Sequence, residues 1–329
     1  TWGQASCCPI ATACRYTKRV NDQPLDDSMP VKPPALPPVN ISPQLPDSPP
    51  PIAAWRWWLH LVILAGYVLG IGLLSATSDQ AETGPGLPTN PVDLLLTLLI
   101  HLGIFGLFFG AAWAASRVNI DQLLMRWQRG WLPWLLGFGY SIAMRLILGI
   151  IVLVVLVSTA VIMVAGSGEP WNRAAYEKVM EDLSERYKPD VETLVDKEAI
   201  QDSPVYLLLN VTLVSFVLAG FREELWRAAM LAGCKALFPA LYAKRRGQVL
   251  CVIGIAIIFG IGHWSQGPGG VVLTTLLGVM LGLIMVFHRS VWEATLAHGF
   301  FNASSFVLMH LLFKYEDQFE QLQKYLPGQ

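Results

Sequence analysis

Ionisable side chains occur in three short motifs that lie within or at the edge of long apolar runs. The motifs are Glu223-Glu224 with Arg227 in FREELWRAAM, Phe259 with His263 in FGIGHW, and His298 with Asn302 in AHGFFN. Inside a membrane such groups cost several kcal/mol and usually mark function. Two carboxylates, two imidazoles, an amide and a guanidinium are the groups of a hydrolytic site. The sequence therefore predicts that three distant segments assemble one such site within a membrane.

The first motif can supply a general base. Glu223 and Arg227 are four residues apart, so on a helix they share a face and can pair, while Glu224 lies one step around the helix. An arginine stays charged and can hold one carboxylate ionised. The other carboxylate is then free to exchange a proton, as a general base must.

The two histidine motifs can supply the remaining groups. His263 ends a helix rich in glycine, where small residues let another helix or a substrate approach. His298 and Asn302 are four apart, so an imidazole N–H and an amide N–H could together hold the oxyanion of a tetrahedral intermediate. The motifs place no serine or cysteine as a nucleophile, which favours water activated by glutamate and histidine.

The sequence predicts no required cofactor, but a metal variant stays open. Glu223, His263 and His298 could bind zinc as a set of two histidines and one carboxylate. Asn302 suits the role of a hydrogen-bond donor better than that of a metal ligand. Water activation without a metal is therefore the preferred interpretation.

The composition is that of a membrane protein. Of the 329 residues 53% are hydrophobic and 14% are charged, whereas soluble domains carry about 25% charged residues. The mean hydropathy is +0.47, and several runs reach the ~20 apolar residues that cross a bilayer. We predict an all-α, polytopic bundle of about seven to eight transmembrane helices. With a net charge of −1, the predicted partners are the lipid bilayer and a peptide or protein substrate, and not nucleic acid.

The chain divides into three parts. Residues 1–54 form an extension rich in proline that is predicted to be disordered, and Met29 within it resembles a natural start, with 1–28 as upstream sequence. Residues 55–313 form the transmembrane domain, which includes the motif core 205–305 and a polar extramembrane loop at 166–203. Residues 314–329 form a short tail.

Hydropathy predicts seven spans, and charge predicts their orientation. The spans are about 57–76, 92–115, the main part of 131–165, 205 onward through the first motif, 248–263, 271–287 and 291–313. The run 131–165 is too long for one perpendicular span, and Pro133 predicts a kinked or interfacial start. Basic patches at 116–130, 235–246 and His288-Arg289 favour the cytoplasmic side, which puts the N-terminus inside and the C-terminus outside.

Other conspicuous residues are interpreted as structural. The pairs Gly66/Gly70, Gly106/Gly110 and Gly278/Gly282 predict close packing between helices of this chain. His60, His101 and His310 are expected to be satisfied core residues, Trp226 and Trp264 to serve in packing, and Arg145 to pair structurally. Asp93 and Glu293 lie at span ends, where a charge is tolerated at low cost. The five cysteines form neither a zinc motif nor a disulfide framework.

The order EE-x-x-R, F-x-x-x-H and H-x-x-x-N on successive helices resembles the CAAX protease and bacteriocin-processing (Abi, CPBP) family of intramembrane proteases. The resemblance covers about residues 205–305. It implies that Glu223 and His263 activate water, that His298 and Asn302 stabilise the oxyanion, and that Glu224 and Arg227 support the site. It also implies an endopeptidase, with metalloendopeptidase activity as the metal-dependent form, in the plasma (inner) membrane of a bacterium.

One feature departs from the family pattern. The usual first motif is EE-x-x-x-R, whereas Arg227 here follows Glu223 by four residues. This shift leaves open which glutamate is the base, and Glu223 is preferred over Glu224. The competing class is a non-catalytic membrane protein, either a transporter with a Glu/His relay or an inactive, partner-binding relative. A transporter would favour inverted repeats and broken helices in both halves, and neither is visible.

Overall fold

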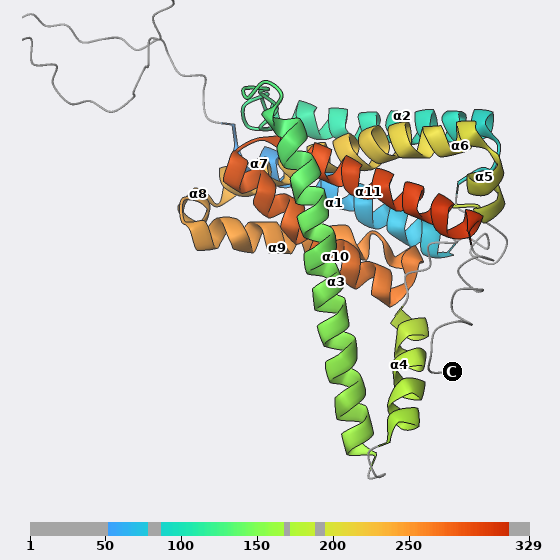
Figure 1. The fold of residues 1–329 in the computed structure, drawn as a ribbon. Coiled ribbons are helices and arrows are strands. Elements are labelled where there is room, and N and C mark those ends of the chain that lie inside the picture. Colours follow the sequence, from blue (N-terminus) through green and yellow to red (C-terminus); the bar gives the residue numbers. More distant parts are fainter. Residues whose placement is uncertain (1–51, 78–86, 168–171, 188–194, 316–329) are drawn as a thin grey trace, which may run out of the picture. The chain divides into compact units, whose positions relative to one another are not determined.

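The computed structural model describes residues 52–77, 87–167, 172–187 and 195–315. All regular structure in these residues is helical, which confirms the all-α prediction. The predicted disorder of the N-terminal extension falls almost entirely outside the described residues, as does nearly all of the tail. Figure 1 shows the elements, which are α1 (Ala54–Thr77), α2 (Pro91–Ser116), α3 (Leu132–Gly166), α4 (Arg173–Tyr187), α5 (Lys197–Asp202), α6 (Pro204–Leu209), η2 (Asn210–Arg222), α7 (Glu223–Leu237), α8 (Pro239–Tyr242), α9 (Arg245–Ile261), η3 (Trp264–Gln266), α10 (Gly267–His288) and α11 (Val291–Lys314).

Six helical segments of the described chain are long and apolar enough to cross a membrane. They are Ala54–Leu74, Pro91–Ser116, Leu132–Gly166, Pro204–Leu237, Trp264–His288 and Val291–Lys314. The seventh predicted span corresponds to α9, which has 17 residues and is therefore shorter than the ~20 that usually span a bilayer. The predicted count of about seven to eight transmembrane helices is reached in the described residues only if α9 is included.

The third apolar run does not have the predicted kinked start. It forms one uninterrupted helix of 35 residues, with Pro133 in the first turn, where a proline needs no hydrogen-bond partner for its nitrogen. The second half of α3 extends beyond its neighbours, and α4 lies beside it (Figure 1). The polar segment 166–203 thus contains helical structure of its own.

Helix α7 is the most buried element of the bundle. Every residue from Glu224 to Gly233 is buried, because α1, α9, α10 and α11 all pack against it. Small residues permit this close approach. A Cβ on Gly233 would lie 2.5 Å from the Leu61 side chain of α1, and one on Gly282 of α10 would lie 3.5 Å from Arg227 Cδ. The first motif therefore lies at the centre of the fold.

The three basic patches come together at one end of the bundle. Leu124 and Met125 of the loop before α3 accept hydrogen bonds from Val291 N at 2.9 Å and from Trp292 Nε1 at 2.7 Å. At the same end the Arg245 guanidinium lies over the Phe287 ring. This arrangement agrees with the predicted placement of the basic patches on a single side.

The three predicted glycine pairs differ in whether they contact another helix. Gly278 and Gly282 pack α10 against Ala256 and Val252 of α9, as predicted. A Cβ on Gly66, Gly70, Gly106 or Gly110 would meet nothing within 4 Å, so the prediction of packing within the chain is wrong for these four glycines. They lie on faces of α1 and α2 that no described helix covers.

Most residues interpreted as structural do serve packing. His60 is fully buried and its ring nitrogens face Ala112 O and Ala229 O at 3.1 and 3.0 Å. Trp226 donates to Leu64 O, His310 Nδ1 donates to Ile200 O, and Arg145 donates to Phe301 O.

Glu293 contradicts the expectation of a low-cost charge at a helix end. Its side chain is only 1% exposed, because the 117–131 loop folds over the start of α11. Sequence position alone placed this residue at the water boundary, but the loop covers it.

Candidate active site

A buried polar network joins the first and third motifs. Glu224 and Arg227 lie three residues apart on α7 and form an ion pair, and His298 Nδ1 of α11 donates to Glu224 Oε1 at 3.0 Å. Glu224 and Arg227 are almost fully buried, and His298 is 3% exposed. A buried charge is tolerated only when it is paired, so Glu224 is neutralised by Arg227 and fixes the orientation of His298.

Arg227 is also held from a second direction. Its guanidinium lies 4.8 Å from the centre of the Phe259 ring on α9, a distance at which a cation and an aromatic face attract each other. The sequence predicted that Arg227 could pair with Glu223, four residues earlier. That pairing is not formed, because Glu224 faces the core and takes the guanidinium.

Glu223 has a different environment from its neighbour. Its side chain is 14% exposed, and Oε1 accepts a hydrogen bond from Arg222 Nη2 at 2.9 Å. Its other oxygen, Oε2, lies 3.9 Å from His298 Nε2, which is too long for a direct hydrogen bond. Glu223 is thus the accessible carboxylate of the pair and has one oxygen directed toward the imidazole.

Helix η2 positions this pair against α11. It is a π-helix of 13 residues that ends immediately before Glu223, and π-helical turns often occur at functional sites. Within this helix, Ser215 Oγ donates a hydrogen bond to Asn210 O, which lies five residues earlier in the sequence. A Cβ on Gly220 would lie 2.9 Å from Thr295 O of α11, and one on Gly299 would lie 2.3 Å from the Phe216 ring. Two glycines therefore allow η2 and α11 to approach closely enough for Glu224 to reach His298.

His263 lies outside this network. It follows the end of α9, is partly exposed, and its Nδ1 donates to Phe259 O at 2.8 Å. This bond leaves Nε2 as the proton acceptor of the neutral ring. No hydrogen bond or ion pair within the described residues joins His263 to either glutamate or to His298. Its link to the network is the Phe259 ring, whose centre lies 4.5 Å from that of His263.

Asn302 lies one turn after His298 on α11 and is partly exposed. In the part of the chain that the structure describes, its amide makes no hydrogen bond within the protein. The two residues of the third motif therefore follow each other along one helix, as their spacing predicted. The Asn302 amide keeps N–H groups that a substrate could use, whereas His298 Nε2 can donate only when the ring carries both protons, because Nδ1–H donates to Glu224.

The residues proposed as zinc ligands do not form a compact set. The described residues contain no group of three or more His, Cys, Asp or Glu side chains arranged to hold a metal ion. Glu223 and His298 are neighbours, but His263 is linked to them only through Phe259 and Arg227. This donor set therefore does not fit zinc in the arrangement of the described residues.

Sequence reasoning missed the role of Arg222. The residue precedes the two glutamates in FREEL, and its basic character next to a carboxylate pair was the available signal. Arg222 Nη2 donates to Glu223 Oε1 at 2.9 Å. Arg222 thus binds the carboxylate that Arg227 leaves free.

Residues 205–304 match the family model described as type II CAAX prenyl endopeptidase Rce1-like. The matched region is therefore similar to the CAAX protease family. The match confirms the resemblance drawn from the motifs, and the matched segment contains all six predicted site residues. No curated protein and no solved structure matches the chain.

The family is one of endopeptidases, and the six apolar segments are those of a multi-pass membrane protein. The match covers less than a third of the chain, from the start of α6 into α11. Elements α1 to α5 therefore lie outside the matched region, although α1 and α3 pack against the site helices.

Proposed function

We propose that this protein is an intramembrane endopeptidase that hydrolyses a peptide bond of a membrane-associated protein or peptide, with Glu223 as the general base. The observation that carries the proposal is the division between the two adjacent glutamates. Glu224 is buried and bound by Arg227 and His298, whereas Glu223 is partly exposed and directs one oxygen toward His298. Only Glu223 has an oxygen available to take a proton from water.

In the proposed reaction Glu223 removes a proton from water as the water oxygen attacks the carbonyl carbon of the scissile bond. The carbonyl oxygen becomes an oxyanion that His298 Nε2–H and Asn302 Nδ2 stabilise. The C–N bond then breaks, and the proton held by Glu223 passes to the leaving amine. Because His298 Nδ1 donates to Glu224, Nε2 can donate only while the ring carries both protons.

His263 is proposed as a second acceptor of the water proton, through Nε2. Its separation from Glu223 makes this role independent of the Glu224–His298 network. The His263→Ala variant therefore separates two versions of the mechanism. A large loss of activity supports the shared role that the resemblance implies, and full activity would leave Glu223 as the only base.

The decisive experiment measures cleavage of a peptide or protein substrate by the purified full chain in detergent. Glu223→Gln is expected to fold normally and to lose activity by about 10²-fold or more, as expected for loss of a general base. His298→Ala and Asn302→Ala are each expected to lose about 10²–10³-fold. Arg246→Gln, an exposed change at the basic end, is the matched control and should remain active.

Full cleavage by Glu223→Gln, in a variant with unchanged thermal unfolding, would reject Glu223 as the base. If no variant and no wild-type preparation cleaves any substrate, an inactive, partner-binding relative becomes the better interpretation. Activity that a chelator abolishes and zinc restores would favour the metal variant, whereas activity unchanged by the chelator supports the carboxylate mechanism. We place the enzyme in the plasma (inner) membrane of a bacterium, with a peptide precursor or a membrane-anchored regulator as substrate.

A further inference from the structure

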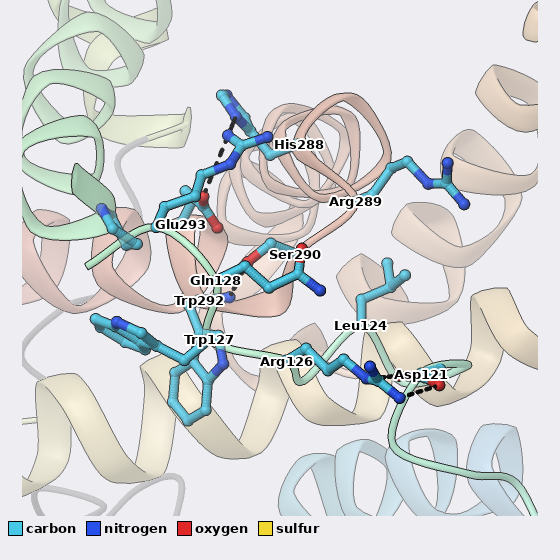
Figure 2. A pocket seen from close by; sticks show the side chains of 12 residues that line it. Asp121, Leu124, Arg126, Trp127, Gln128, His288, Arg289, Ser290, Trp292 and Glu293 are labelled. Carbon is cyan, nitrogen blue, oxygen red and sulfur yellow. Dashed lines mark hydrogen bonds and ion pairs between the residues drawn. The ribbon is translucent and has the colours of Figure 1, made fainter. Parts of the chain in front are cut away.

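A second polar site lies at the basic end of the bundle, separate from the proposed active site. Here the 117–131 loop, the start of α3 and the α10–α11 turn enclose a cavity of about 440 Å³, a volume typical of small-ligand pockets. Figure 2 shows the side chains that line it. None of the six predicted catalytic residues is among them.

One side of this pocket contains a buried carboxylate that lacks hydrogen bonds. Glu293 is 1% exposed, and neither of its oxygens has a hydrogen-bond partner in the described residues. Arg129 Nη1 lies 3.5 Å from Oε1, and it donates instead to His288 Nδ1 at 2.8 Å. Arg129 therefore offsets the charge of Glu293 and leaves its acceptor capacity free.

His288 adds no positive charge to this side. Because arginine can only donate, His288 Nδ1 must be the acceptor, and Nε2–H then donates to Tyr140 Oη at 2.7 Å. The ring is thus the neutral tautomer. A ligand group that satisfies Glu293 must carry N–H or O–H donors, and a compact ammonium suits a buried carboxylate best.

The opposite side of the pocket is basic. In Figure 2, Arg126 and Arg289 lie across Ser290 and Gln128 from Glu293. Arg126 is paired with Asp121, whereas the exposed Arg289 forms no ion pair within the described residues. Its φ of 53° is a left-handed conformation that favours glycine. The pocket thus combines an acceptor for a cation with donors for an anion.

The pocket also adjoins the first turn of α3. Pro133 lines the pocket, and the exposed residues that follow on α3 are large and apolar, namely Trp134, Leu135 and Phe138. Exposed tryptophans are typical of the interface between membrane and water. A ligand held here by its polar group could therefore extend acyl chains along α3.

We propose that this pocket binds the headgroup of an aminophospholipid of the phosphatidylethanolamine class. The ammonium lies against Glu293, the phosphate against Arg126 and Arg289, and the acyl chains follow α3. An anionic lipid fits less well because Glu293 and Asp121 would face it. A choline headgroup fits less well because its nitrogen has no N–H to donate to Glu293.

The test is native mass spectrometry of the full chain in detergent, with phosphatidylethanolamine, phosphatidylcholine and phosphatidylglycerol of identical acyl chains. The wild type should retain phosphatidylethanolamine at least tenfold better than either other lipid. Glu293→Gln and Arg289→Gln should each weaken this retention at least tenfold. Arg246→Gln, which removes the same charge outside the pocket, should not. Since Arg289 is exposed, its variant tests the site even if Glu293→Gln fails to fold.

Equal retention of phosphatidylcholine, or a preference for phosphatidylglycerol that Arg246→Gln also reduces, would overturn the proposal. Soluble glycerophosphoethanolamine that binds as tightly as the lipid would assign the pocket to a free phosphoethanolamine compound instead. Displacement of the lipid by a peptide with a free C-terminal carboxylate, but not by its amide, would assign it to a peptide. Lipid retention is measured without catalysis, so failure of this proposal is distinct from failure of the peptidase assignment.

Discussion

Arg227 determines how the two neighbouring glutamates divide their roles. It is as deeply buried as Glu224, with side-chain exposures of 1% and 0%, and it has the Phe259 ring against its other face. Removal of one partner of a buried ion pair leaves an uncompensated charge, whereas replacement of both partners by groups of similar size can be nearly neutral. The stability of the site and its chemistry can therefore be separated.

Arg227→Met should lower the free energy of unfolding by about 3–5 kcal/mol, because Glu224 remains buried without its cation. The double variant Arg227→Met with Glu224→Gln should regain most of that loss and remain poorly active, because His298 is no longer held by a carboxylate. Unfolding in mixed micelles and peptide cleavage measure the two effects. Equal instability of the single and double variants would contradict the assigned pair.

Six candidate site residues were predicted from the sequence, but the pairing among them was not. The spacing of Glu223 and Arg227 permits an ion pair, and so does the spacing of Glu224 and Arg227. The choice between these pairs depends on which carboxylate faces α11. That in turn depends on the direction of the chain where η2 ends and α7 begins. The buried state of Glu293 was missed for a similar reason, since it depends on the distant 117–131 loop. Arg222 was missed although it adjoins Glu223 in the sequence.

At the scale of elements, the contact between η2 and α11 controls the site. Gly220→Ala should reduce cleavage at least tenfold, because the new Cβ would lie 2.9 Å from Thr295 O and 3.0 Å from Ser215 O, and backbone atoms cannot move aside as a side chain can. The two helices must then separate, and a shift of about 1 Å at a catalytic centre costs about 10²-fold in rate. The measurement is kcat/KM for the variant and the wild type.

Gly254→Ala is the matched control for this change. Gly254 lies within α9, and a Cβ there would meet nothing within 4 Å. Alanine is favoured over glycine in a helix by about 1 kcal/mol, so this variant should be at least as stable as the wild type and fully active. If both alanine variants behave alike, close approach of η2 and α11 is not what positions His298.

The π-helix itself could not be predicted from the sequence. Apolar periodicity distinguishes a helix from a strand, but it carries little signal for the number of residues per turn in the run before Glu223, where most residues are apolar. The length of the 131–165 run and Pro133 likewise predicted a kinked or interfacial start, whereas α3 is one helix of 35 residues. Proline at the first turn instead suits a helix start, so the chain continues without interruption.

At the scale of the whole molecule, the class and most spans followed directly from composition and run length, because the bilayer sets both. The sequence could not determine how far each helix extends beyond the membrane. For α3 this depends on packing, because its second half is in contact with α4. The position of the basic patches was predictable from charge alone. Their meeting around a cavity was not, because it depends on the fold of the 117–131 loop.

The orientation in the membrane remains a prediction and can be tested directly. Charge predicts that the basic end that contains Arg246 lies in the cytoplasm and that α4, which contains Glu185, lies on the opposite side, with the Pro204–Leu237 segment between them. In a chain whose five cysteines are replaced by alanine, Glu185→Cys should react with an impermeant maleimide on intact cells. Arg246→Cys should react only after the membrane is opened. Both side chains are exposed, so reactivity reports location and not burial. Labelling of both positions from outside would mean that the Pro204–Leu237 segment, which lies between them, does not cross the membrane, and the candidate glutamates on it would then require a different route of access for water.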